Sequence, residues 1–213
     1  MDERFVDLRS TKNPKARIKM LSGHFATKNS HVNTYIDMST VKTRHNNARE
    51  TARTLADEYI TNTMVDTIVC MKNTEVIGTF MAEHLADASN MSMSAGNNIS
   101  VVTPEFDATG QILFRDNNQR MIEGKQVLIL TDSMATGSLT MQAIESVLYY
   151  GGTVCGICAV FSAISKVAGM EVKTIFTGSD LPDYHVYNAH ECPLCRENHR
   201  LDGLINSFGY VRL

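Results

Sequence analysis

The sequence predicts an α/β fold in which a parallel sheet is flanked by helices. Two observations carry this prediction. Short apolar runs alternate with helix-like segments along the 213 residues, and one run, Val127–Leu130, is wholly apolar, as strands buried on both faces of a parallel sheet are. A loop of small residues follows this run, and an amphipathic helix is expected over Met141–Tyr150. Strands that alternate with helices are joined by crossover connections, which make the sheet parallel.

The remaining elements are predicted from the same patterns. Strands are expected at residues 65–70, 99–102, 153–161, 172–176 and 185–187, and helices at 14–21 (capped by Asn13), 39–60, 74–88 and 164–169. A strand-like piece at 23–28 leads into a turn at 29–33 and a return at 34–37. A hairpin is expected from 111–114 and 120–122, around a turn at 116–118.

Length and composition narrow the class of protein. The length favours one domain, residues 1–213, in which residues ~1–40 and ~180–213 form a cap over one edge, and the 43% hydrophobic content allows a sizeable core. The net charge of −3 provides no basic field, so no nucleic-acid partner is expected. No run approaches the ~18 apolar residues of a membrane span, and the N-terminus lacks the apolar core of a signal peptide. We therefore expect a cytoplasmic protein without a membrane partner.

The most informative stretch follows the apolar run at 127–130. Asp132 comes at the carboxyl end of the expected strand, where open α/β sheets bind ligands. Thr136, Gly137, Ser138 and Thr140 then supply hydroxyls and close backbone approach at a helix N-terminus, which suits a phosphate. A carboxylate ahead of a phosphate loop suits a sugar phosphate. An ordinary strand–loop–helix junction, capped by Ser138 or Thr136, would show the same pattern.

This stretch resembles the phosphoribosyl diphosphate (PRPP) motif of type I phosphoribosyltransferases. That motif is an apolar strand, two adjacent acids, two further residues and a loop such as Thr-Thr-Gly-Gly-Ser; here Thr131 stands at the first acid and Asp132 at the second. The resemblance implies a type I phosphoribosyltransferase fold with a small hood, Mg²⁺ bound with PRPP, and Asp132 as a catalytic residue. The implied PRPP- and phosphate-binding residues are Lys72, Thr131, Asp132, Ser133, Ala135, Thr136, Gly137, Ser138, Leu139 and Thr140.

Two further segments are similar to orotate phosphoribosyltransferases. Residues 23–31 with 35–37 resemble their N-terminal signature, and Lys28 falls where some members carry a lysine that contacts orotate. The Cys-Pro-Leu-Cys sequence at 192–195 is similar to the tail of one branch of these enzymes. The resemblance implies a homodimer that transfers a phosphoribosyl group from PRPP to a nucleobase, with orotate as the leading candidate, and releases pyrophosphate. Lys28 would be a second catalytic residue.

Several segments depart from the family pattern. The loop at 71–75 has no glycine where the family has a small pyrophosphate loop, and Lys72 is its one basic residue. The run 103–110 carries no basic residue, and Ser162-Ala163 stands where an Asp-Arg pair would help to read the base. Each loss removes a strong charge-assisted contact. Two alternatives therefore stay open: a catalytically impaired regulatory protein that binds PRPP or a nucleotide, and a phosphoribosyltransferase for a different base.

Cysteines and histidines suggest one metal site. The five cysteines do not look like a disulfide framework, but Cys192 and Cys195 have the spacing of a zinc knuckle, with His190 and His199 nearby. Structural Zn²⁺ and reduced, partly buried thiols both fit this pair.

A second Cys-x-x-Cys pair, Cys155 and Cys158, lies inside an expected strand. Its side chains should point to opposite faces, so the two thiols cannot easily share one metal, although one of them is free to join the Cys192–Cys195 pair. Spacing identifies no partner for five other histidines, for which a surface position or a satisfied hydrogen bond is the expectation: His24, His31, His45, His84 and His185.

Overall fold

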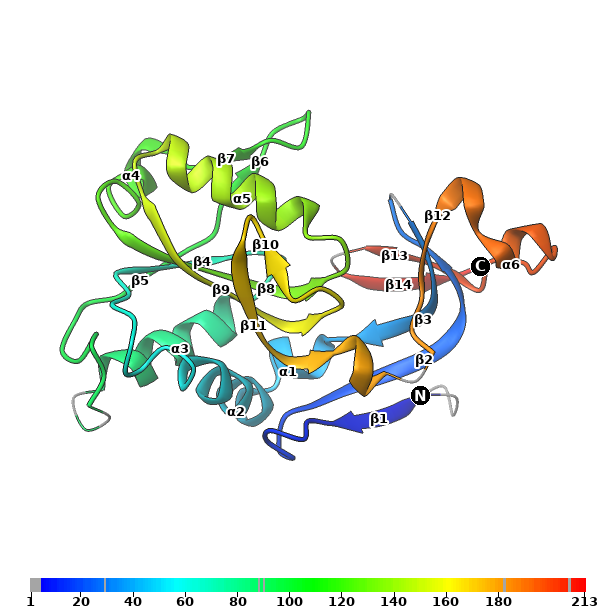
Figure 1. The fold of residues 1–213 in the computed structure, drawn as a ribbon, viewed down its shortest axis with the longest axis horizontal. Helices are drawn as coiled ribbons and strands as arrows, with labels where there is room; N and C mark the ends of the chain where they lie inside the picture. The colour runs from blue at the N-terminus through cyan, green and yellow to red at the C-terminus, as the bar shows by residue number, and fades with distance from the viewer. Residues whose placement is uncertain (1–4, 29, 88, 90, 182, 207) are drawn as a thin grey trace.

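The chain folds into a helix-flanked main sheet and a second sheet beside it, each of six strands in the part of the chain that the structure describes (Figure 1). A computed structural model describes residues 5–28, 30–87, 89, 91–181, 183–206 and 208–213. Among the helices in these ranges, none is both long and apolar enough to cross a membrane. The division into one domain stays a prediction.

The main sheet confirms the predicted α/β class. Its strand order is β10-β11-β9-β8-β4-β5, and β11, β9, β8, β4 and β5 run parallel to one another. The bounds are β4 Thr67–Cys70, β5 Ser100–Val102, β8 Gln126–Met134, β9 Thr153–Ser162, β10 Lys166–Val167 and β11 Met170–Thr177. Each of the predicted apolar runs therefore forms a strand of this sheet or, at 185–187, of the second one.

Both faces of the main sheet are covered, as the unbroken apolar run of β8 requires. α2 (His45–Ala56) and α3 (Glu75–Ala86) lie on one face, and α5 (Ser138–Tyr149) lies on the other (Figure 1). Leu128 and Leu130 belong to the core under α2 and α3, whereas Val127 and Ile129 belong to the core under α5. Alternate residues of one strand thus fill two hydrophobic layers.

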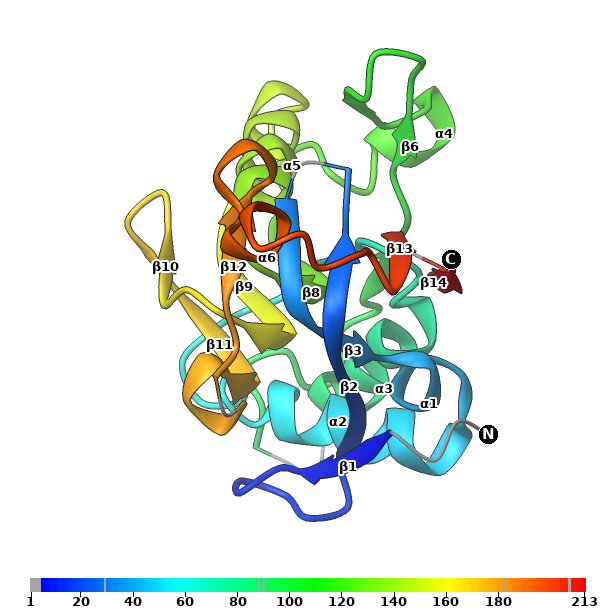
Figure 2. The same cartoon turned by 90° about the vertical axis from the view of Figure 1, so that its right-hand side faces the viewer.

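The second sheet is assembled from both ends of the chain. Its order is β12-β3-β2-β13-β14, with β1 paired to β2. The bounds are β1 Val6–Arg9, β2 Arg17–Ala26, β3 Ser30–Asp37, β12 Val186–Asn188, β13 Gly203–Asn206 and β14 Gly209–Arg212. Seen from the side in Figure 2, the long strands β2 and β3 run along the main body. Leu21, Phe25, Val32 and Tyr35 form the core of this sheet.

Two predictions for the N-terminal region are wrong. Residues 14–21 do not form a helix, because Arg17 already begins β2 and the strand is held by β1 and β3 on its two sides. The turn expected at 29–33 is shorter, since β3 begins at Ser30; residue 29 lies outside the described residues. Tertiary pairing overrides the local helix signal here.

The long helix expected over 39–60 is interrupted. It divides into α1 (Ser39–Thr43) and α2 at Arg44, whose backbone is extended (φ −91°, ψ 115°).

The expected hairpin and the short helix after β9 are also wrong. β6 (Glu105–Phe106) pairs with β7 (Ile112–Leu113), and Asp116–Gln119 forms the short helix α4. Residues 164–169 lead into a hairpin of β10 and β11, in which Ala168 and Gly169 both have positive φ, as a two-residue turn with the twist of the sheet requires. The remaining helix, α6, spans Pro193–Arg196.

Candidate functional site

The candidate site lies where the strand order of the main sheet reverses. The chain passes from β4 to β5 on one side and later places β8 on the other side of β4. In open α/β sheets ligands bind beyond the carboxyl ends of strands at such a switch point. Cys70, the last residue of β4, pairs with Leu130, so Asp132 lies on β8 two residues beyond the end of its neighbour.

Asp132 is a nearly buried carboxylate paired with two lysines. Lys42 Nζ lies 2.9 Å from Oδ2, and Lys72 Nζ lies 3.6 Å from Oδ1. The Asp132 and Lys42 side chains are 7% and 13% exposed, so this contact is shielded from water. The Ser133 backbone N–H and hydroxyl also donate to Oδ1. These three side chains, one acid and two bases, together carry an excess of positive charge, which suits an anionic ligand.

The loop after β4 holds Lys72 in this position without a glycine. Lys72 and Asn73 have φ of 54° and 60°, the left-handed region that costs non-glycine residues roughly 1–2 kcal/mol each. The Thr74 hydroxyl donates to the Met71 carbonyl (2.8 Å), and Lys72 Nζ donates to the Ser133 carbonyl (2.9 Å). A strained backbone of this kind persists only where surrounding contacts hold it in place, which is typical of ligand-binding loops.

The phosphate-type loop links β8 to α5. Its helix begins at Ser138, three residues earlier than expected, so Ser138 and Thr140 lie in the first turn. The first N–H groups of a helix have no partner inside it, and they face outward with the positive end of the helix dipole. Gly137 precedes the helix with φ 77°, and a Cβ there would lie 2.8 Å from Ile164 Cδ1. The close approach between residue 137 and the Ile164 side chain therefore requires glycine.

Most of the predicted PRPP-binding residues come together at this place. Thr131, Asp132 and Ser133 are on β8, Lys72 faces them from the loop after β4, and the run 135–140 follows directly. Thr136 and Ser138 are exposed, Ala135 and Leu139 are half-buried, and Thr140 is buried. Lys28 is different, because its side chain is exposed in the bend between β2 and β3 and does not contact Asp132.

Sequence reasoning gave no site role to two residues near Asp132, although one of them, Tyr35, lies in the 35–37 segment that carries part of the resemblance. Lys42 lies on α1. In the sequence it looks like any other polar residue of the long helix expected over 39–60. Tyr35, at the end of the second sheet, is 6% exposed. Burial raises the pKa of its hydroxyl, and the negative charges of Asp37 and Asp132 raise it further, so Tyr35 stays a protonated hydrogen-bond donor.

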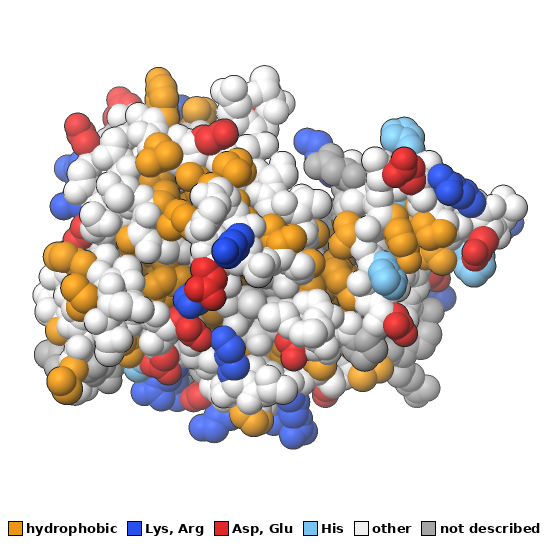
Figure 3. Space-filling view, in the orientation of Figure 1, with side chains coloured by type: hydrophobic (Ala, Val, Ile, Leu, Met, Phe, Trp, Pro, Cys, Tyr) orange, Lys and Arg blue, Asp and Glu red, His pale blue; other side chains and the backbone are white. Residues whose placement is uncertain are grey.

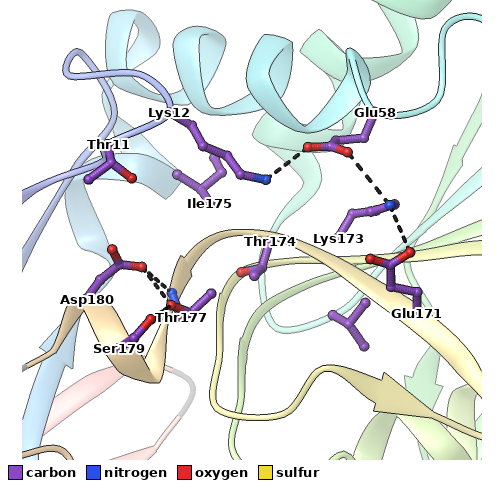
Figure 4. Close-up of a pocket in the computed structure, with 11 residues that line it drawn as sticks. Thr11, Lys12, Glu58, Glu171, Lys173, Thr174, Ile175, Thr177, Ser179 and Asp180 are labelled. Carbon is purple, nitrogen blue, oxygen red and sulfur yellow. Dashed lines mark hydrogen bonds and ion pairs between the residues drawn. The ribbon is translucent and has the colours of Figure 1, made fainter.

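A separate cavity of about 350 Å³ lies on another part of the molecule (Figure 4). Four of its charged groups form ion pairs: Lys12 Nζ lies 2.9 Å from Glu58, and Lys173 Nζ lies 3.8 Å from Glu58 and 3.0 Å from Glu171. The fifth, Asp180, accepts hydrogen bonds from Thr177, so the lining keeps an excess of negative charge. The contact with Lys173 lowers the pKa of Glu171. None of the predicted site residues lines this cavity, so it does not compete with Asp132 as the candidate site.

The structure also changes the interpretation of the cysteines. Cys192 and Cys195 lie together with His24 and His31, the histidines for which spacing identified no partner, rather than with His190 and His199. Cys155 and Cys158 are on β9 in the main sheet and do not join this cluster, and burial raises the pKa of both thiols.

The chain is similar to known proteins in its sequence and in its fold. No family model matches the chain. Its sequence is 26% identical over 138 residues to an orotate phosphoribosyltransferase of Caldicellulosiruptor bescii, covering 58% of this chain and 70% of that protein.

Solved structures share the fold at lower identity. An orotate phosphoribosyltransferase of Mycobacterium tuberculosis matches with TM-score 0.53 and 17% identity, covering 76% of this chain and 91% of that one. An adenine phosphoribosyltransferase of Thermoanaerobacter pseudethanolicus matches with TM-score 0.52 and 13% identity, covering 82% and 95%. The resemblance is therefore confirmed: the chain has the type I phosphoribosyltransferase fold, and its sequence is similar to that of an orotate phosphoribosyltransferase.

Proposed function

We propose that this protein transfers a phosphoribosyl group from PRPP to a nucleobase and releases pyrophosphate, with orotate as the leading acceptor. The observation that carries the proposal is the buried Asp132, held between Lys42 and Lys72 at the switch point and directly ahead of the loop at 135–140. The relative from Caldicellulosiruptor bescii supports it by its name, and a Mycobacterium tuberculosis orotate phosphoribosyltransferase of the same fold (TM-score 0.51) was solved in complex with PRPP.

Each part of the site has a role in this reaction. The loop at 135–140 binds the 5′-phosphate through the free N–H groups of α5 and the Thr136 and Ser138 hydroxyls. Asp132 accepts hydrogen bonds from the ribose hydroxyls. As the bond to the diphosphate breaks, positive charge develops on the ribose, and the nearby carboxylate stabilises it. Lys72 faces the departing pyrophosphate from the loop after β4.

The proposal includes a magnesium ion bound with PRPP, for which Asp132 would be the protein ligand. Mg²⁺ is usually held by one or two carboxylates together with substrate phosphates, and Asp132 supplies one carboxylate. When bound, Mg²⁺ neutralises the charge that builds up on the leaving diphosphate. Lys42 and Lys72 add two positive charges to the same region.

Lys28 and the subunit arrangement complete the proposal. Lys28 would contact the base or the pyrophosphate from the exposed bend between β2 and β3. A homodimer is supported by apolar side chains that α5 leaves in solvent: Leu148 is 57% exposed and Tyr149 is 84% exposed, and Met141, one heptad before Leu148, is 37% exposed.

One observation favours a regulatory protein that binds PRPP or a nucleotide without turnover. Thr131 provides no second acid, and the Lys42 and Lys72 ammonium groups compete with the ribose hydroxyls for the oxygens of the remaining acid, Asp132. The alternative of a different base is supported by Ser162 and Ala163, which offer no charge at the end of β9.

The test measures pyrophosphate release from PRPP and Mg²⁺ with orotate, uracil, hypoxanthine, guanine and adenine in turn. Release with one base, lost in Asp132→Asn and kept in Asp7→Asn, an exposed acid on β1, would support the transferase. Calorimetric binding of PRPP or a nucleotide without release would support the regulatory protein. If Asp132→Asn bound PRPP and released pyrophosphate as the unmodified protein does, Asp132 would have no role in the site.

A further inference from the structure

Four metal-ligating side chains meet in the second sheet. His24 lies on β2, His31 on β3, and Cys192 and Cys195 flank the start of α6, and their donor atoms all lie within 4.8 Å of one another. In the space-filling view, separate histidine side chains are exposed on the part of the molecule that carries this sheet (Figure 3). We propose that these four residues bind one structural Zn²⁺.

The distances between donor atoms fit a tetrahedral ion. Bond lengths of 2.0–2.1 Å to nitrogen and 2.3 Å to sulfur predict about 3.3 Å between two nitrogens and about 3.6 Å between nitrogen and sulfur. His24 Nε2 lies 3.0 Å from His31 Nδ1, 3.5 Å from Cys192 Sγ and 3.7 Å from Cys195 Sγ. His31 Nδ1 lies 3.4 Å from Cys195 Sγ. Small adjustments of the side chains would therefore suffice to coordinate the ion.

The surroundings orient His24 as a ligand. Its Nδ1 lies 3.0 Å from the His199 carbonyl oxygen, which can only accept a hydrogen bond. The proton of a neutral imidazole is therefore on Nδ1, and the lone pair of Nε2 faces the cluster. This arrangement, in which the second ring nitrogen donates to a carbonyl, is characteristic of zinc-binding histidines. The backbone of His24 is fixed as well, because its N–H donates to Asp202 Oδ2 (2.8 Å).

The Cys192–Cys195 turn presents two sulfurs to one point. Pro193 begins α6, and the Arg196 N–H donates to the Cys192 carbonyl (3.2 Å), so the turn places both thiols on the same side. Cys192 is 1% exposed, whereas Cys195 is exposed. The ion would thus be shielded from water on one side and reachable from the other. Two thiolates and two imidazoles are a closed donor set that favours Zn²⁺ over Mg²⁺ or Ca²⁺.

A metal here would add a further link between the stretch 189–199 and the second sheet, to which the flanking strands β12 and β13 are already paired. The stretch 189–199 contains one turn of 3₁₀-helix and the four-residue α6, and it has no strand or long helix of its own. The ion would connect this stretch to β2 and β3, more than 160 residues earlier in the chain, as zinc does in small domains with a limited core.

The experiment measures metal on the full chain, independently of any phosphoribosyl transfer. The protein is prepared in reductant, zinc is quantified by mass spectrometry, and Co²⁺ is exchanged for it. We expect one zinc per chain, a thiolate-to-cobalt charge-transfer band and the intense visible bands of tetrahedral Co²⁺. The melting temperature should fall on chelation and recover when Zn²⁺ is added back.

Substitutions at the exposed side of the cluster test whether these side chains bind the ion. Cys195→Ser and His31→Ala should weaken Zn²⁺ affinity by more than the ~10–100-fold caused by loss of a second-shell contact. Cys155→Ser is the matched control, since that thiol is on β9 outside the cluster, and it should bind zinc normally. Failure of the reduced protein to bind Zn²⁺ or Co²⁺, unchanged affinity in Cys195→Ser, or a Cys192–Cys195 disulfide in place of the metal would each overturn the proposal.

Discussion

Replacing Lys42 by methionine should destabilise the fold, because it removes the closer of the two positive charges that face a buried carboxylate. The ammonium lies 2.9 Å from Asp132 Oδ2, and the two side chains are 13% and 7% exposed. Removing one partner of a fully buried pair costs about 3–5 kcal/mol. Lys72 still faces the carboxylate at 3.6 Å, so we expect the lower figure of a charge-assisted hydrogen bond, about 2 kcal/mol of unfolding free energy.

The measurement is urea unfolding followed by circular dichroism, with Lys12→Met as the control. Lys12 Nζ lies at the same 2.9 Å from Glu58, but its side chain is 47% exposed, so its loss should cost only about 0–1 kcal/mol. At this chain length about 2 kcal/mol corresponds to a fall in melting temperature of roughly 4–8 °C. Equal shifts in the unfolding midpoint of the two variants would refute the reasoning that burial makes the Lys42 contact strong.

Three further predictions concern buried or half-buried residues: two glycine substitutions and the effect of pH on two thiols. Gly137→Ala should lower the unfolding free energy by about 1–2 kcal/mol, because φ is 77° and its Cβ would lie 2.9 Å from Val167; a rise in melting temperature would contradict this. Gly78→Ala should destabilise by about 1–3 kcal/mol, since its Cβ would lie 2.3 Å from Cys70 Sγ, and Cys70→Ala should rescue it in a double-mutant cycle. Burial raises the pKa of the Cys70 and Cys155 thiols from 9.0 to about 12. Stability should therefore fall as the pH rises from about 9 towards 12, and iodoacetamide should label these thiols slowly until then; rapid labelling at pH 9 would contradict their burial.

The main sheet was predictable because its parallel strands contain short apolar runs. The run at 127–130 has no polar side chain to satisfy, so burial between two helical layers is its favourable state; β4 adds Thr67, whose hydroxyl donates to the Met121 carbonyl. The loop at 135–140 was predictable for a related reason, since small residues after a buried strand leave room for a close approach. The position of Asp132 follows from its place directly after the run.

The rest depended on contacts that the local sequence does not encode. Lys42 reaches Asp132 from α1, which the extended backbone of Arg44 separates from α2. His24 and His31 became neighbours through the β2–β3 register, in which Ala26 pairs with His31. Cys192 joins them from 168 residues away. Each of these depends on pairing between distant segments, which residue spacing cannot show.

The parallel pairing of β13 with β2 bears on how the chain folds as it is made. Residues 67–177 carry the whole main sheet and can assemble early, but the partners of Phe25 and Ala26 on β13 are Gly203 and Leu204. Until those residues are synthesised, one edge of β2 has unpaired N–H and carbonyl groups, which invite pairing with another chain. Closing so long a loop is also slow. The nascent second sheet is therefore where we expect chaperone contact or misassembly to concentrate.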